Sequence, residues 1–183
     1  MTKASTKTKT GAAAPRRVVE ARAPRPGYRA MLEPRAKAKT ERRALLDVNV
    51  LIALLDADHL HHRRATRWLA EHVALGWASC AITQNGCVRI MSQPGYPNSL
   101  PAARVAERLR EATLTEHHAF VPDTPSLLDP ALFDTEQLLG HRQVTDAWLL
   151  GLAVRHDLRV VTFDAAMPLR VVRGASAAHV VAL

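Results

Sequence analysis

Short apolar runs alternate with amphipathic segments along the sequence from residue 44 to its end. The apolar run of residues 44–46 suits a buried strand, and the longer apolar stretch of residues 48–55 predicts a helix directly after it. Asn49 is expected to cap that helix. Strands separated by helices predict an α/β fold with a parallel sheet and right-handed crossovers. The expected strands are 44–46, 77–82, 118–121, 158–162 and 177–183, and the expected helices are 48–55, 61–72, 83 to about 92 with Thr83 as N-cap, one opening at Pro101, and 143–156.

Polar side chains recur where the predicted strands end and the helices begin. Asp47 closes the first strand, and Asp164 follows the strand 158–162. Asp146 falls in the first turn of the helix 143–156, and Gln84 follows the second strand. The carboxyl ends of parallel strands share one edge of a sheet, so these side chains are expected to converge. Taken alone, Asp47 is equally well explained as a helix cap or turn residue.

Three converging carboxylates predict a metal site. At 4 Å and an effective dielectric constant of about 20, each pair of carboxylates repels by about 4 kcal/mol, so the group stays ionised only beside a cation. Oxygen ligands favour Mg²⁺, with Mn²⁺ also suitable. The chemistry that such a site serves best is phosphodiester hydrolysis, in which the metal provides the attacking water and stabilises the leaving oxygen.

Charge divides the sequence into two parts. Residues 1–43 hold 13 of the 25 Lys and Arg residues but only three of the 17 acidic ones, so this segment has a charge of +10 and the remainder has a charge of −2. Its prolines and scarcity of large apolar residues predict a basic, disordered extension over residues 1–42. The extension could bind nucleic acid or keep the protein soluble. A third alternative is that Met31 is the true start. Residues 43–183 are expected to form one domain.

Cellular location follows from what the sequence contains. At 48% hydrophobic residues over 183 positions, the chain can bury a sizeable core. No apolar run approaches the roughly 20 residues that span a bilayer. A secretory signal is not evident either, so a cytoplasmic protein without membrane contact is expected. Cys80 and Cys87 do not form a disulfide framework and are expected to be buried, reduced side chains.

Four ordered segments of residues 43–183 resemble a known family. They are L-L-D-V-N-V-L-I-A-L, T-Q-N-G-C-V-R-I, V-T-D-A-W-L-L-G-L-A and V-V-T-F-D, and they resemble the signature segments of PIN-domain ribonucleases, in particular the VapC-type toxins of bacterial toxin–antitoxin modules. The resemblance implies a three-layer α/β/α fold with a central, mostly parallel sheet. It also implies a Mg²⁺-dependent endoribonuclease that cleaves RNA, forms a homodimer and is neutralised by a VapB-like antitoxin.

The resemblance also assigns roles by position. Asp47, Asp146 and Asp164 match the metal-site acids of the family. Asn49 matches a polar residue that supports the first acid, and Thr162 matches a hydroxyl position behind the acids. These five residues are therefore the expected centre of the active site.

Gln84 departs from the family pattern, because relatives usually have a catalytic glutamate where T-Q-N-G stands here. A glutamine oxygen can bind Mg²⁺ but carries no charge and cannot act as a base at neutral pH. We therefore expect one firmly bound metal and a weak or substrate-assisted second one. Two interpretations stay open: a nuclease weakened by Gln84, and an inactive PIN fold that binds RNA or an antitoxin.

Other polar residues have simpler interpretations. Arg89 and Arg142 flank the acid-bearing segments and could contact RNA phosphates, although surface arginines are common in any protein. The closely spaced histidines have no further His or Cys at a zinc-finger spacing, so we interpret them as residues at the entry of a helix. They are His59, His61 and His62. Asp56 is interpreted as a turn or cap residue.

Overall fold

The computed structural model describes residues 42–183, which contain one five-stranded sheet. Its order is β3-β2-β1-β4-β5, and every neighbouring pair is parallel. The sheet confirms the predicted parallel α/β architecture. The predicted basic extension lies outside the described residues, apart from Arg42. The strands are β1 (Ala44–Leu46), β2 (Trp77–Ser79), β3 (His118–Phe120), β4 (Arg159–Thr162) and β5 (Val180–Ala182).

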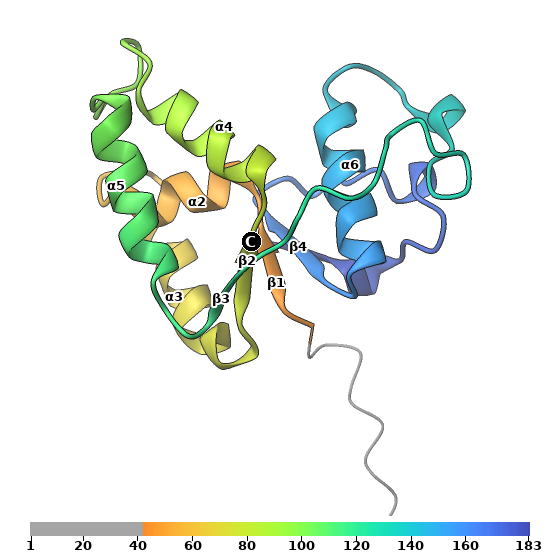
Figure 1. Ribbon diagram of the computed structural model, residues 1–183, viewed down its shortest axis with the longest axis horizontal. Helices are drawn as coiled ribbons and strands as arrows, with labels where there is room; N and C mark the ends of the chain where they lie inside the picture. The colour runs from red at the N-terminus through yellow and green to blue at the C-terminus, as the bar shows by residue number, and fades with distance from the viewer. Residues whose placement is uncertain (1–41) are drawn as a thin grey trace, which may run out of the picture. The chain divides into compact units, whose positions relative to one another are not determined.

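Helices cover both faces of the sheet. Helices α2 to α5 lie on one face and α6 lies on the other, so the domain has the expected three α/β/α layers (Figure 1). No helix in residues 42–183 has the length and apolar character needed to cross a membrane. The helices are α2 (Val48–Leu55), α3 (His62–His72), α4 (Ala81–Met91), α5 (Ala102–Thr113) and α6 (Gln143–Arg155), with short 3₁₀ turns at η1 (Val73–Leu75), η2 (Thr135–Gln137), η3 (Leu169–Val171) and η4 (Ala177–His179).

The side chains of the central strands divide between two cores. Leu45 and Val160 belong to the core that packs against α6. Leu46 and Val161, one residue further along each strand, belong to the core beneath α2 to α5. All four are fully buried, and each contributes roughly 1.5–3 kcal/mol through burial. Successive side chains of a strand point to opposite faces of the sheet. Each of these short strands therefore packs against the helices on both faces.

Two helix starts differ from the predictions. Asp47, and not Asn49, is the N-cap of α2, and its Oδ1 accepts the backbone N–H of Val48 at 2.6 Å. Helix α4 begins at Ala81, so Thr83 lies inside the helix instead of capping it. The Thr83 hydroxyl reaches back and accepts the backbone N–H of Cys80 at 3.1 Å. This bond satisfies a donor that a helix start leaves free, and it ends β2 three residues earlier than predicted.

The sheet order places a switch point between β1 and β4. From β1 the chain moves outward through β2 to β3 and then returns to the opposite side of β1 as β4. In open α/β sheets, ligands bind at the carboxyl ends of the strands where the order reverses. Asp47 follows β1, and Asp164 follows β4 closely. The topology therefore brings two of the predicted acids to the expected position.

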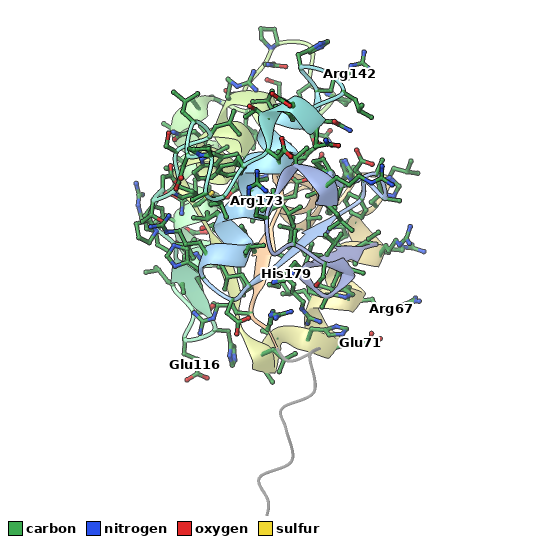
Figure 2. All side chains as sticks on the ribbon, turned by 90° about the vertical axis from the view of Figure 1, so that its right-hand side faces the viewer. Arg67, Glu71, Glu116, Arg142, Arg173 and His179 are labelled. Carbon is green, nitrogen blue, oxygen red and sulfur yellow. The ribbon has the colours of Figure 1, made fainter. Side chains whose placement is uncertain are left out.

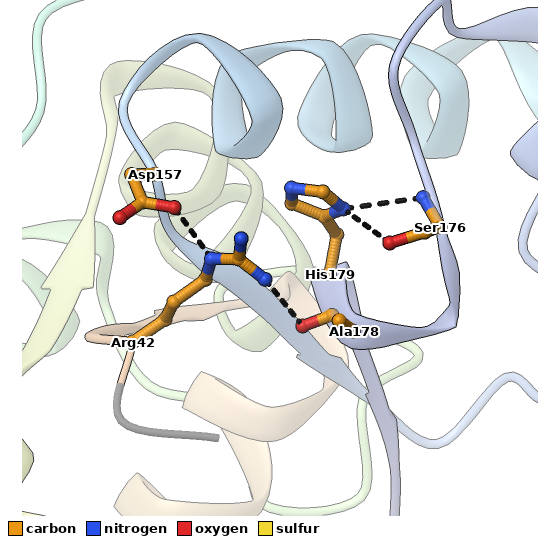
Figure 3. Close-up of polar contacts among 5 residues, drawn as sticks. All are labelled: Arg42, Asp157, Ser176, Ala178 and His179. Atoms are coloured by element: carbon orange, nitrogen blue, oxygen red, sulfur yellow. Dashed lines mark hydrogen bonds and ion pairs between the residues drawn. The ribbon is translucent and has the colours of Figure 1, made fainter. Parts of the chain in front are cut away.

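Arg42 attaches the start of the described chain to the residues that precede β4 and β5 (Figure 3). Its Nε donates to Asp157 Oδ1 at 2.5 Å, and its Nη1 donates to the Ala178 carbonyl at 3.2 Å. Beside it, the Ser176 backbone N–H donates to His179 Nδ1 at 3.1 Å. Because the Asp157 side chain is 80% exposed, the ion pair contributes no more than about 1 kcal/mol.

Candidate active site

The hydroxyl of Thr162 connects the residues at the ends of β1 and β4. Its Oγ1 donates to Asp47 Oδ2 at 2.7 Å. The same oxygen accepts from Asn49 Nδ2 at 3.3 Å and from the backbone N–H of Asp164 at 3.1 Å. Thr162 is fully buried at the end of β4, so the hydroxyl is held rigidly. The structure therefore brings these four predicted residues together.

Asp47 has two structural roles that are compatible. One carboxylate oxygen caps α2 through Val48 and the other accepts from Thr162, and each oxygen keeps a further lone pair. Burial raises the pKa of Asp47, although the hydrogen bonds from Thr162, Val48 and Asn49 oppose this and repulsion from Asp164 adds to it. A partly buried carboxylate of this kind gains from a nearby cation. Capping therefore does not exclude a functional role.

Asp146 joins the group from the other layer of the domain. It lies in the first turn of α6, whose following residues 147–153 are buried against the sheet. Burial, followed by repulsion from Asp47 and Asp164, raises the pKa of Asp146 from 3.8 to about 6. Asp47 and Asp146 line one cavity, and the Thr162 hydroxyl that holds Asp47 also accepts the backbone N–H of Asp164, so the three acids lie in one neighbourhood.

A cavity of about 550 Å³ opens at this point, lined by Asp47, Asn49, Asp146 and Arg89 among others. Asp164 does not line this cavity and is exposed beside it. Arg89 is exposed on α4 and brings a positive charge to the cavity. The cavity thus combines two carboxylates with a guanidinium group.

Oxygen donors in the cavity suit a divalent metal. The carboxylates of Asp47 and Asp146 are hard ligands of the kind that Mg²⁺ and Mn²⁺ prefer. Asn49 Oδ1 is buried without a hydrogen-bond partner, so a cation or its water would satisfy it. Within residues 42–183 no three Asp, Glu, His or Cys side chains form a complete ligand group. Mg²⁺ commonly retains several waters and uses one or two carboxylates, and the donor set therefore fits.

The structure does not bring Gln84 into this group. Its Nε2 donates to Ser79 Oγ at 2.9 Å, and Ser79 Oγ lies 2.8 Å from His118 Nε2. Gln84 lines a separate cavity of about 320 Å³ beside α5. Because α4 begins at Ala81, Gln84 lies one turn inside the helix, and its side chain bonds to Ser79 at the end of β2 instead of lining the acidic cavity.

Arg142 also lies outside the acidic cavity. It precedes the first residue of α6 and is not among the residues that line the cavity. Figure 2 shows its side chain projecting outward at one end of the molecule. Of the two predicted arginines, only Arg89 is next to the acids.

Two neighbouring residues of α4 also contribute to the cavity. Asn85 lines both cavities, and Gly86 lines the acidic one. A side chain at Gly86 would place its Cβ only 2.8 Å from Val48 Cγ2, so glycine allows α4 to approach α2. The T-Q-N-G segment contained this signal, because a glycine in the middle of a helix commonly marks a close approach.

Comparison with known proteins gives the class of this fold. The family model of the PIN domain matches residues 44–172. This range covers most of the chain, and the chain therefore belongs to the PIN-domain family.

Individual relatives narrow the class to the VapC type. Ribonuclease VapC44 of Mycobacterium tuberculosis (strain ATCC 25618 / H37Rv) is 52% identical over 141 residues, which cover 77% of this chain and 99% of the relative. Ribonuclease VapC38 of the same strain is 42% identical over 123 residues, which cover 67% of this chain and 85% of that relative. The crystal structure of Mycobacterium tuberculosis VapC20, a sarcin–ricin loop cleaving toxin, aligns with a TM-score of 0.50 and 15% identity over 68% of this chain and 92% of that one. This last likeness supports the fold alone.

Proposed function

We propose that this chain is a divalent-metal-dependent endoribonuclease of the VapC type. The observation that carries the proposal is the shared cavity of Asp47 and Asp146, with the pKa of Asp146 raised to about 6 by burial and by Asp47 and Asp164. The alignment of this chain with a relative that is named a ribonuclease covers 99% of that relative's length. RNA is therefore the substrate class, and Mg²⁺ or Mn²⁺ is the cofactor.

Each residue of the site has a distinct task in this proposal. Asp47 and Asp146 hold the metal, and Asp164 adds negative charge at the rim. When bound, the metal supplies an activated water and stabilises the leaving oxygen of the phosphodiester. Thr162 fixes the orientation of Asp47 through its 2.7 Å hydrogen bond. Arg89, which also lines the cavity, contacts a phosphate of the RNA.

The position of Gln84 favours an active nuclease over a module that only binds RNA or an antitoxin. Gln84 lines a different cavity from Asp47 and Asp146. A neutral side chain there leaves the charge of the three carboxylates intact. Gln84 instead holds Ser79 at the end of β2 through its 2.9 Å hydrogen bond.

The VapC relatives also support partners for this chain. We propose a VapB-like antitoxin that neutralises the nuclease, a homodimeric assembly and a location in the cytoplasm. Leu128 and Leu139 are 86% and 89% exposed, and apolar side chains of this size at a surface are compatible with contact to another chain. Sedimentation of the purified chain alone and with its antitoxin tests both assemblies.

Cleavage of RNA by matched variants tests the proposed activity. The wild type should cleave in Mg²⁺ and stop in EDTA. Asp146→Asn should lose about 100-fold or more, because the metal contributes several kcal/mol to the transition state. Asp123→Asn removes an exposed acid in the loop after β3 and should cleave normally. Equal cleavage by both variants, or cleavage that persists in EDTA, would contradict the proposal.

A further inference from the structure

A basic cavity lies one strand beyond the acidic site. It has a volume of about 560 Å³ and is formed between α3 and the carboxyl half of β5. Three arginines line it, namely Arg63, Arg64 and Arg67, while Glu71 contributes one carboxylate. Figure 2 shows the side chains of Arg67 and Glu71 at the surface of the domain. The cavity is therefore open to solvent and positively charged.

Two contacts join this basic cavity to the acidic site. Leu183 lines the basic cavity, and its backbone N–H donates to the Thr162 carbonyl at 2.8 Å. His61 lines the cavity as well, and its ring packs against Phe163 with the centroids 4.4 Å apart. Thr162 holds Asp47 through its hydroxyl. The basic cavity is therefore linked to Asp47 through Leu183 and Thr162.

The three arginines are not neutralised by the described part of the chain. Within residues 42–183, none of their guanidinium groups is within ion-pair distance of a carboxylate. Arg63 and Arg67 are four residues apart on one helix, and like charges at that spacing destabilise a helix by a few tenths of a kcal/mol. Glu71 is the one carboxylate of α3, and it forms no ion pair with the three arginines. Their guanidinium groups are therefore available to an external anion.

We propose that the basic cavity binds the phosphates of the RNA segment that flanks the cleaved bond. This inference rests on the proposed nuclease function and adds a substrate-binding site to it. Arg89 stands at the acidic cavity, and the α3 arginines stand beyond β4, so cations lie on both sides of the acids. A polyanion crossing the carboxyl edge of the sheet would meet a positive charge before and after the metal. Guanidinium groups bind phosphate through paired hydrogen bonds.

The salt dependence of RNA binding tests this site. A fluorescent RNA oligonucleotide is titrated with the full chain in EDTA, where cleavage does not interfere, at several salt concentrations. The triple variant Arg63→Gln, Arg64→Gln and Arg67→Gln should reduce the slope of log affinity against log salt by about 0.7 for each phosphate that is no longer bound, or about 2 in total. In Mg²⁺ the same variant should raise KM and leave kcat unchanged, because the arginines do not touch the reacting atoms.

A second triple variant controls for net charge. Arg108→Gln, Arg155→Gln and Arg170→Gln removes three exposed charges from α5, α6 and η3, and it should keep the wild-type slope. Equal slopes for the two triple variants, while the wild type binds and cleaves RNA, would overturn the inference and leave the proposed function intact. A loss of self-association in the α3 variant with unchanged RNA binding would also overturn it and assign the cavity to an interface between two copies. A wild type that neither binds nor cleaves RNA would instead contradict the proposed function.

Discussion

Replacing Asp146 by Asn is expected to stabilise the metal-free protein at neutral and alkaline pH. The pKa of Asp146 in the folded protein is about 6, raised from 3.8 first by burial and then by Asp47 and Asp164. A raised pKa of a carboxyl group means that its ionised form opposes folding. The cost is fully present above about pH 6 and disappears as the pH falls toward 3.8. Asparagine is close in size to aspartate and carries no charge, so the variant avoids this cost.

The size of the effect follows from the same shift. Moving a pKa from 3.8 to about 6 corresponds to about 3 kcal/mol at most. Asp146 is only half-buried, and solvent screening reduces this to about 1–2 kcal/mol. For a domain of this length, each kcal/mol raises Tm by about 2–4 °C. The variant should therefore melt about 2–8 °C above the wild type at pH 8 in EDTA, and the difference should shrink as the pH approaches 4.

Thermal unfolding in EDTA and in Mg²⁺ measures both the stability effect and its link to the metal. The wild type should gain Tm when Mg²⁺ is added, because a ligand that binds only the folded state stabilises it. Asp146→Asn should gain little. Asp123→Asn is the control for the loss of one charge, and it should follow the wild type in both buffers. If Asp146→Asn melts at or below the wild-type Tm in EDTA at pH 8, the three acids do not repel one another and the reasoning fails.

Three further predictions concern other parts of the chain. Tyr96→Phe removes the 2.6 Å hydrogen bond from the Tyr96 hydroxyl to buried Asp56 and should cost roughly 1.5–3 kcal/mol in urea unfolding; an unchanged midpoint would contradict this. Deletion of residues 1–41 should flatten the salt dependence of RNA binding by about 0.7 for each phosphate that this segment binds, whereas an unchanged slope would mean that the segment does not bind RNA. Gln84→Glu should leave the calorimetric Mg²⁺ affinity within about twofold of the wild type, since Gln84 lies in a separate cavity and the added charge is screened; a clear tightening would place this side chain at the metal.

The sequence predicted the convergence of the acids because that convergence depends on topology. Asp47 and Asp164 follow strands whose apolar runs are unmistakable, and neighbouring parallel strands end at one edge of a sheet. Thr162 is buried at the end of β4 and bonds to Asp47 for the same reason. The resemblance to PIN domains added the order of the segments and the family roles of these residues.

Details that depend on backbone conformation were not predictable in this way. Asp47 and Asn49 are both good cap residues, and the choice between them depends on the extended backbone of Asp47, with φ −67° and ψ 158°. The start of α4 depends similarly on the extended conformation of Cys80 and on the Thr83 hydroxyl that bonds to it. The position of Gln84 follows from that start, and sequence spacing alone does not give it.

Long-range hydrogen bonds explain one further difference. The sequence predicts Asp56 to be an ordinary turn or cap residue, and it is indeed the C-cap of α2. It is also buried and accepts hydrogen bonds from Tyr96 and Asn98. These partners lie about forty residues further along the chain in a loop rich in proline and glycine. Local patterns do not show which distant loop returns to a helix end.

The most direct test of the metal site is anomalous diffraction from a crystal of this protein soaked in Mn²⁺. We expect one strong anomalous peak between the carboxylates of Asp47 and Asp146, at about 2.0–2.3 Å from their oxygens, and the same soak of Asp47→Asn should lose it. A peak that persists in the variant, or that lies instead among His59, His61 and His62, would contradict the assignment of the acids as the metal site.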